Sequence, residues 1–468
     1  MENILYKFNE KVISLVTKYL ENTIGNGELS NFTDEMLKEL MNLGQETAEF
    51  LVNYAEERIY ELKERKEEFS SLEKDNRKII TIFGEINFKR RYYEDKETKE
   101  KIYLLDQYLG LEPKQRMLTN VKERLLEEAI ESSYEKAGKQ AAYGIEISKE
   151  TVMKEIEKLE IKPCKKEVIE KKQEKRIYVI ADEDHVHLQK GGIDEPRMVI
   201  VYDGIERKGK RIELKNKKHF GGIYKSKIDD LWEEIMNYIE ETYDTEYLEK
   251  IYIAGDGANW IKSGKEWLIK SEYVLDEFHM KKAISGIVGR STKENKEIKE
   301  QQKEEMRTAL RELNFESFKE KSYEIIAEEM QKSTRERKIK LMEYILNNEE
   351  GITNLYKNKE ELHGCSAEGH ISHIYSARMS SRPMGWKTEN VDKMSKLRLL
   401  KEDKVSVKDI LKSTNKIIEF EEIKKIKSKI DKKIKTSINF KPQSIPALQF
   451  GNIEERMQLK KLLRYKAV

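Results

Sequence analysis

The chain has 468 residues, and at about 150 residues per domain this length predicts three domains. Charged residues make up 38% of it and hydrophobic residues another 38%, and its aromatic content excludes a disordered polyelectrolyte. A mean hydropathy of -0.79 and the lack of a long uncharged apolar run exclude a membrane-spanning helix. The two cysteines, Cys164 and Cys365, are too few for a disulfide framework and predict a protein of the reducing cytoplasm.

Charge is distributed unevenly along the chain. Residues 401–468 carry 18 basic and 9 acidic side chains, whereas the whole chain has a net charge of +2. A basic tail on an otherwise acidic chain indicates a polyanionic partner. A solvated lysine-rich tail without a partner explains the same composition equally well.

The first 75 residues are predicted to form a helical region. Apolar residues recur at helical spacing over residues 4–20, and a second run of this kind follows a capping motif at residues 31–34. Alternating apolar residues on both sides of Gly84 then predict a β-hairpin with this glycine at its turn. The second strand ends in a basic and aromatic cluster, in which Arg90 and Arg91 are candidates for DNA contact.

Residues 76–160 join this hairpin to a stretch of helix-turn-helix character. Helices are predicted over residues 121–133, 134–143 and 149–159. Gly144 lies in the turn, and Ser148 is the predicted cap of the third helix. This geometry places a helix N-terminus, here at Lys149, in a DNA major groove, although many αα-hairpins bind nothing.

Residues 177–285, which follow a predicted linker at 161–176, have the pattern of a mixed α/β core. Strands are predicted at 177–181, 198–202, 211–214, 250–254 and 273–275, with a helix at 229–243. This order is that of a ribonuclease-H-like domain, and two of its strands end in Asp182 and Asp256. Carboxylates at one sheet edge repel each other unless cations lie between them, and oxygen ligands select Mg²⁺ or Mn²⁺. The pattern therefore predicts two such ions.

A third carboxylate is needed to complete such a site. Residues 286–360 are predicted to form a helical insertion, and residues 361–400 return to the core with Glu368 near the start of the final helix. Asp184 lies on the same strand face as Asp182 and is an alternative first ligand. The basic tail at 401–468 completes the chain.

Other side chains near these positions have both a functional and a structural interpretation. His279 either contacts DNA or braces the sheet as a hydrogen-bond partner of Asp276. Glu183 points to the strand face opposite Asp182 and is assigned a structural role. Asp203 lies in an Asp-Gly pair typical of a turn.

Residues 363–386 have a distinctive composition. Arg378 and Arg382 are candidates for binding DNA phosphates, and together with the neighbouring Trp386 they are candidates for stacking on bases. The alternative is a helix-capping arginine and a core tryptophan. The histidines and the cysteine of this segment lack the paired spacing of structural zinc sites, and packing or phosphate contact is favoured for them.

Several motifs occur together in this chain. They are an aspartate after a strand, a Gly-Asp-Gly motif, a D-x-x-H motif and a distant glutamate, at Asp182, Asp256, Asp276 and Glu368. The most specific motif is Ser-Ala-Glu-Gly-His followed by Ser-Ser-Arg-Pro-Met-Gly-Trp, at residues 366–386. With these motifs the chain resembles, over nearly its whole length, the DDE transposases of bacterial insertion sequences. The resemblance is to the ISLre-type family of the Mutator-like superfamily.

The resemblance implies a DNA transposase in which Asp182, Asp256 and Glu368 are the catalytic, metal-binding triad. Such an enzyme binds terminal inverted repeats, cleaves a phosphodiester to free a 3′-hydroxyl and joins it to target DNA by two-metal-ion catalysis. Its expected partners are double-stranded DNA and at least one further copy of the chain. It is expected in the cytoplasm, associated with the nucleoid, and without contact with a membrane. The alternatives are a metal-dependent ribonuclease-H-like nuclease without strand transfer and a transposase-derived DNA-binding protein.

The expected fold class is α/β. A mainly helical N-terminal DNA-binding region with a β-hairpin precedes a ribonuclease-H-like mixed sheet core, which is interrupted by an α-helical insertion.

Overall fold

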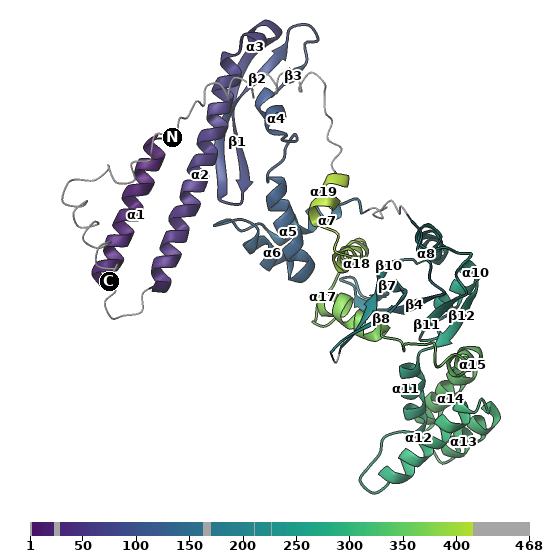
Figure 1. Cartoon of the computed structure of the whole chain (residues 1–468). Coiled ribbons are helices and arrows are strands. Elements are labelled where there is room, and N and C mark those ends of the chain that lie inside the picture. The colour runs from purple at the N-terminus through teal and green to yellow at the C-terminus, as the bar shows by residue number, and fades with distance from the viewer. Residues whose placement is uncertain (1, 23–28, 162–169, 210, 226, 415–468) are drawn as a thin grey trace, which may run out of the picture. The chain divides into compact units, whose positions relative to one another are not determined.

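The chain forms two compact units, which we describe from a computed structural model (Figure 1). The described residues are 2–22, 29–161, 170–209, 211–225 and 227–414. The first unit ends at Leu118 and the second begins at Thr119, so the predicted region 76–160 is divided between them. Residues 162–169 of the predicted linker and 415–468 of the basic tail lie outside the described residues.

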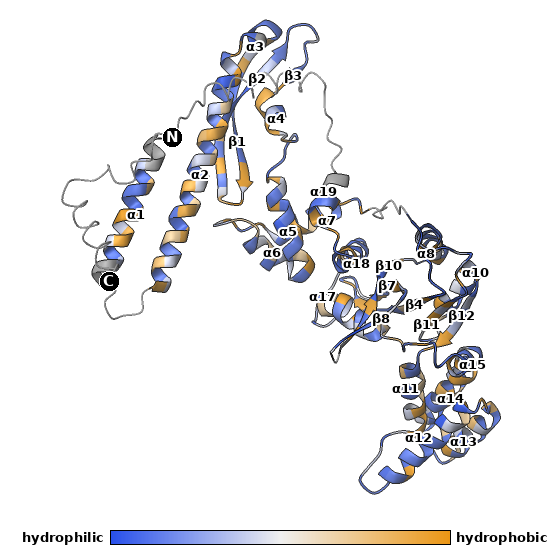
Figure 2. Ribbon diagram, in the orientation of Figure 1, coloured by the Kyte–Doolittle hydropathy of each residue, from blue (hydrophilic) through white to orange (hydrophobic). Residues whose placement is uncertain are grey.

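The first unit packs helices against a β-hairpin. Its elements are α1 (Glu2–Asn22), α2 (Leu29–Glu61), α3 (Lys63–Glu68), β1 (Phe69–Thr81), β2 (Gly84–Asp95), β3 (Lys101–Ile102) and α4 (Leu104–Leu109). Orange and blue residues alternate around α1 and α2 in Figure 2, as expected for amphipathic helices. The predicted hairpin is present with longer strands. Its turn consists of Ile82 and Phe83, and Gly84 opens the second strand at a φ of 123°, which favours glycine.

The three helices predicted after residue 120 are present at the start of the second unit. They are α5 (Thr119–Glu131), α6 (Tyr134–Gln140) and α7 (Lys149–Glu157). Ser148 caps α7 as predicted, because its hydroxyl oxygen accepts a hydrogen bond from the Thr151 backbone N–H at 3.3 Å. Helices α5 and α7 pack against α18 (Thr388–Glu402), and α5 also packs against α19 (Val407–Thr414).

A five-stranded mixed sheet forms the centre of the second unit. Its strands, in spatial order, are β10 (Lys218–Gly222), β7 (Arg197–Tyr202), β4 (Arg176–Glu183), β11 (Lys250–Gly255) and β12 (Ser271–Leu275). Strands β4, β11 and β12 are parallel, while β7 is antiparallel to both of its neighbours.

The strand predicted at 211–214 belongs to a separate hairpin of β8 (Gly204–Lys208) and β9 (Arg211–Lys215), and β10 takes its expected place in the sheet. The hairpin alternates charged and apolar residues and leaves Ile212 exposed, whereas Phe220 of β10 is buried. Burial therefore selects β10 as the third strand of the sheet. A second small hairpin consists of β5 (Val186–His187) and β6 (Ile193–Asp194).

The two faces of the sheet differ. The odd-numbered residues of β4 and β11 pack in a hydrophobic core with α8 (Ile228–Thr242) and α11 (Glu277–Val288). The opposite face, here called the even face, carries Tyr178, Ile180 and Asp182 of β4 and Tyr252 and Ala254 of β11, because strand residues two apart share a face.

A run of helices follows β12, and the predicted insertion of residues 286–360 covers this run except for most of α11, which belongs to the stretch predicted as core. The helices of this run are α11, α12 (Lys296–Arg311), α13 (Phe315–Ala327), α14 (Lys332–Leu346) and α15 (Glu349–Lys357), the last of which packs on β12. The chain then passes through residues 358–366, the covering segment, to α16 (Ala367–Ile371), a π-helical turn (Ser372–Ser376) and α17 (Ala377–Met379). Two short helices, α9 (Asn259–Lys262) and α10 (Gly264–Trp267), follow β11. In the part of the chain that the structure describes, no helix combines the length and the apolar character needed to cross a bilayer.

Candidate functional site

Three aspartates lie in one row at the carboxyl ends of neighbouring parallel strands. Ala254 of β11 pairs with the residues of β4 and β12 that precede Asp182 and Asp276 by two positions. Asp256 itself follows Ala254 by two, so the three aspartates continue one row of the even face. The Asp276 backbone N–H donates to the Gly255 carbonyl at 2.8 Å and extends the strand pairing to this row. We call these three residues the acidic row.

Asp182 is the most perturbed carboxyl group of the row. Its side chain is buried, and its Oδ1 accepts a hydrogen bond from the Glu183 backbone N–H at 2.9 Å. Burial raises the pKa of Asp182, the charges of Asp256 and Glu368 raise it further, and the resulting value is about 7. The other two carboxylates predicted as ligands therefore both act electrostatically on Asp182.

The helical insertion holds the loop that carries Asp256. Tyr344 of α14 donates a hydrogen bond from its hydroxyl group to the Asp256 backbone carbonyl. Gly257 has a φ of +98°, and a Cβ atom there would lie 2.6 Å from the Asn348 Oδ1. The Asn348 amide is fixed in turn, because it donates to the Tyr344 carbonyl at 2.8 Å. The loop therefore requires glycine both for its conformation and for its contact.

We expect Gly257→Ala to lower the free energy of unfolding by about 2–4 kcal/mol, because left-handed strain adds to a steric clash. The matched control is Gly144→Ala, where φ is +65° and the space around a Cβ is open. It should cost about 1 kcal/mol, from strain alone. Urea unfolding of the full chain measures both values, and equal losses would contradict the bracing of the Asp256 loop.

Asp276 and His279 form a pair at the start of α11. The Asp276 Oδ1 accepts from the Phe278 backbone N–H at 2.9 Å and caps the helix, while its Oδ2 lies 3.2 Å from the His279 Nδ1. This hydrogen bond raises the pKa of His279, and the charges of Asp182 and Asp256 also raise it against the effect of burial. The carboxylates of the acidic row therefore stabilise the protonated form of His279 relative to that of a free imidazole. Its contact with DNA stays a prediction.

Glu368 lies in the first turn of α16, which packs against β4, and its side chain is exposed. The helix continues through the π-helical turn, an irregularity frequent at functional sites. Ser376 and Ser380 donate hydrogen bonds to the Asp184 carboxylate at 3.1 and 2.8 Å. Asp184 thereby ties this segment to the end of β4. Both of its oxygens accept serine hydroxyls, which favours Asp182 as the first ligand.

The donor chemistry of the site fits a hard divalent cation. All the candidate ligands are carboxylates, and Asp182 has a raised pKa because it is buried beside Asp256 and Glu368. A cation would relieve that repulsion. Among the residues that the structure describes, no three His, Cys, Asp or Glu side chains stand close enough to hold a metal ion. Binding an ion therefore requires the carboxylates to draw closer together.

Glu183, for which a structural role is predicted, and Asp203, which is predicted to lie in a turn, both accept side-chain hydrogen bonds. The Trp260 Nε1 donates a hydrogen bond to the Glu183 carboxylate. Asp203 accepts hydrogen bonds from Lys172 at 3.2 Å and from Asn216 at 2.9 Å. Neither side chain belongs to the acidic row.

The predicted DNA-binding residues of the second unit fall into two groups. Arg378 is buried, donates to the Ala129 carbonyl at 3.0 Å and lies 4.9 Å from the Trp386 ring centroid. The Trp386 Nε1 donates to the Met379 carbonyl at 3.0 Å. These contacts give both residues a structural role, whereas Arg382 and Lys149 are exposed. Contact of these residues with DNA stays a prediction.

Arg90 and Arg91 of the first unit are occupied by internal ion pairs. Arg90 lies 3.1 Å from the Asp75 carboxylate, also pairs with Asp106, and its guanidinium lies 3.5 Å from the Tyr103 ring centroid. The Arg91 guanidinium pairs with carboxylates of α2, Glu56 at 3.3 Å and Glu57 at 2.8 Å. Both arginines hold the hairpin to its neighbours, and their proposed DNA contact is untested.

Tyr344 and Asn348 support the site, but no sequence motif marks them. They lie in the insertion, where apolar spacing indicates helices but gives no sign of which loop they contact. Their partner Gly257 did carry a signal, because it belongs to the Gly-Asp-Gly motif.

The fold and the acidic row define a mixed α/β protein with carboxylates gathered at one edge of a five-stranded sheet. The chain matches UPF0236, an uncharacterised protein family, over residues 24–416, and it belongs to that family.

Three relatives illustrate the match. A UPF0236 protein of Caldanaerobacter subterraneus subsp. tengcongensis is 36% identical over 472 residues, covering 100% of this chain and 99% of the relative. A second protein of that organism, whose name joins eleven locus designations, is 35% identical over 472 residues, covering 100% and 98%. A UPF0236 protein in the vanSb 3′ region of Streptococcus gallolyticus is 29% identical over 231 residues, covering 46% and 49%.

Proposed function

We propose that this protein is a DNA transposase of the DDE type. It binds the ends of an insertion sequence, cleaves a phosphodiester to free a 3′-hydroxyl and joins that hydroxyl to target DNA. The observation that carries the proposal is the acidic row at the sheet edge. The pKa of Asp182 in this row is raised by burial and further by the charges of Asp256 and of Glu368, which lies outside the row.

Two further observations support the proposal. The strand order and directions agree with those of a ribonuclease-H-like sheet, which we propose as the fold of the core. The eleven locus designations of one relative suit a gene that multiplies within a genome, as a mobile element does.

In this proposal Asp182, Asp256 and Glu368 hold two divalent cations, with Mg²⁺ or Mn²⁺ preferred by an all-oxygen donor set. Bound there, the ions supply stabilisation of negative charge on the oxygens of the phosphodiester. The chain contributes positioning, because β4 and β11 fix two carboxylates on a rigid edge and Asp184 ties the Glu368 segment to it. His279, whose pKa is raised by its hydrogen bond with Asp276, adds positive charge beside the reacting phosphate when it is protonated.

The proposed partner is double-stranded DNA, both as element end and as target. Lys149, at the N-terminus of α7, and Arg382 are exposed and available to phosphates. The basic composition of residues 401–468 agrees with a polyanionic partner. Two element ends must be processed together, so we propose a homodimer or a higher assembly on DNA.

The test is a strand-transfer assay with the full chain, Mg²⁺, a supercoiled plasmid and a duplex carrying the sequence that flanks the reading frame. We expect a nick at the element end and covalent joining of the freed 3′-hydroxyl to the plasmid. A duplex with a scrambled end is the control. Cleavage without joining would identify a nuclease. Binding without cleavage would identify a DNA-binding protein, and either result would overturn the proposal.

A further inference from the structure

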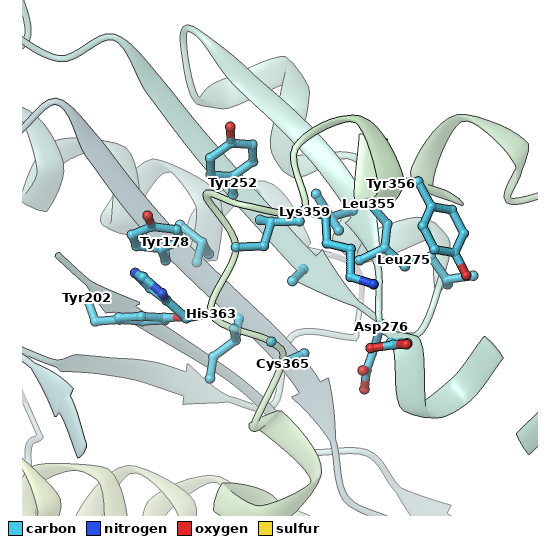
Figure 3. Close-up of a pocket in the computed structure, with 17 residues that line it drawn as sticks. Tyr178, Tyr202, Tyr252, Leu275, Asp276, Leu355, Tyr356, Lys359, His363 and Cys365 are labelled. Carbon is cyan, nitrogen blue, oxygen red and sulfur yellow. The ribbon is translucent and has the colours of Figure 1, made fainter. Parts of the chain in front are cut away.

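A cavity of about 270 Å³ lies on the even face of the sheet, under the covering segment (Figure 3). Its volume falls just below the range of roughly 300–1,000 Å³ that accommodates drug-sized ligands, so it suits a single ring system. The covering segment is anchored beside it, because the Tyr178 hydroxyl donates to the Glu361 carbonyl at 2.8 Å. The cavity is therefore a built feature of the fold, and the proposed catalytic residues do not fill it.

The floor of the cavity continues into the acidic row. One row of the floor consists of Tyr202, Tyr178 and Tyr252, whose neighbouring ring centroids lie 5.2 and 5.8 Å apart. The next row contains Ala254 between its strand neighbours, and the acidic row follows two residues further along each strand. At about 3.3 Å per residue this step is roughly 6.6 Å. A planar group over the Ala254 row would thus lie one step from the proposed phosphodiester site, whereas the tyrosine row lies two steps, roughly 13 Å, from it.

The cavity offers stacking surfaces and hydrogen-bonding groups. His363 of the covering segment lies against Tyr178 with ring centroids 4.6 Å apart and ring planes tilted by 47°, so an imidazole ring forms part of the aromatic lining. Asp276, a member of the acidic row, and Lys359 lie near one end of the cavity and provide an acceptor and a donor (Figure 3). Cys365 lines the wall of the cavity. Burial raises the pKa of its thiol, and the charges of Asp276, Asp182 and Asp256 raise it further.

We propose that this cavity receives one unpaired base of the DNA strand that is cut at the acidic row. The inference rests on the proposed function and adds a subsite to it. A base turned out of the duplex is held by stacking on aromatic rings and by polar contacts with its edge. The aromatic lining, the size of the cavity and the Asp276–Lys359 end supply these contacts, and Asp276 marks the end at which the cavity meets the acidic row, on the side of the attached phosphate.

The first test fills the cavity with Ala254→Leu. Cleavage of the end duplex should fall by about tenfold to hundredfold, the range expected for losing one stacked base. Duplexes that carry one abasic nucleotide, placed in turn at each position flanking the cut, identify the position that is turned out. At that position the abasic nucleotide should restore the cleavage rate of Ala254→Leu. Ala327→Leu, an exposed position on α13, is the matched control and should leave the rate unchanged.

The second test keeps the cavity intact and measures binding with Asp256→Asn. A mismatch at the same position should tighten binding about fivefold or more, because a mismatched base costs less to unpair. Normal cleavage by Ala254→Leu would overturn the inference, and so would the absence of any effect of mismatches on binding. A wild-type chain that neither binds nor cleaves the intact end duplex would instead overturn the proposed function.

Discussion

Replacing Asp182 or Asp256 by asparagine should reduce cleavage of the end duplex by at least about a thousandfold, which corresponds to about 4 kcal/mol of barrier height. Asparagine preserves the size of each side chain and removes the charge that binds a hard cation. It also preserves an oxygen that can accept the Glu183 backbone N–H, so the local fold should persist. Single-turnover cleavage in Mg²⁺ measures the loss, while circular dichroism and DNA binding monitor the fold.

The matched control is Asp184→Asn, two residues after Asp182 and directly after the end of β4. Its carboxylate is used by the hydroxyls of Ser376 and Ser380, so its loss should lower the free energy of unfolding by about 1–3 kcal/mol. Cleavage should remain within about tenfold of the wild type. A large loss of cleavage in Asp184→Asn with little loss in Asp182→Asn would make Asp184 the first ligand. Unchanged cleavage in both Asp182→Asn and Asp256→Asn would show that the active site lies elsewhere.

Without divalent cations, Asp182→Asn should stabilise the folded protein at neutral and alkaline pH. Burial and neighbouring carboxylates raise the pKa of Asp182 to about 7 from an ordinary value of 3.8. A raised pKa means that the folded state loses stability as pH rises from about 4 to 7. The gain from asparagine should therefore be small near pH 4, grow to about 2–4 kcal/mol by pH 7 and stay constant above it. Urea unfolding of both proteins across this range measures it.

Mg²⁺ or Mn²⁺ should abolish this difference. An ion that binds the folded site at a hundred times its Kd stabilises by about 2.7 kcal/mol, and the wild type should gain this at pH 8. Asp182→Asn should show almost no shift in its melting temperature. Equal stabilisation of both proteins would show that the cations bind away from Asp182.

The elements of the core were predictable where local pattern and burial agree. Strands β4 and β11 are largely apolar runs. Both were predicted, with Asp182 and Asp256 placed where these runs end. The third strand was misplaced by a few residues, because two short segments compete and burial in the sheet decides between them. The cap at Ser148 was predictable because capping depends on residues within one turn.

The roles of charged residues were less predictable. The sequence shows that Arg90, Arg91 and Arg378 are cationic, but their partners are distant in the chain and emerge only when the elements pack. The same holds for Asp184, whose serine partners are 192 and 196 residues away.

The sequence by itself determined the order of helices and strands and the placement of carboxylates at strand ends, because these depend on neighbours a few residues apart. Tertiary structure alone decided that Asp276 joins the acidic row, that Tyr344 and Asn348 brace the Asp256 loop, and that Asp276 also lines a cavity on the even face. Such features depend on strand register and on contacts between segments about a hundred residues apart, which local periodicity does not encode.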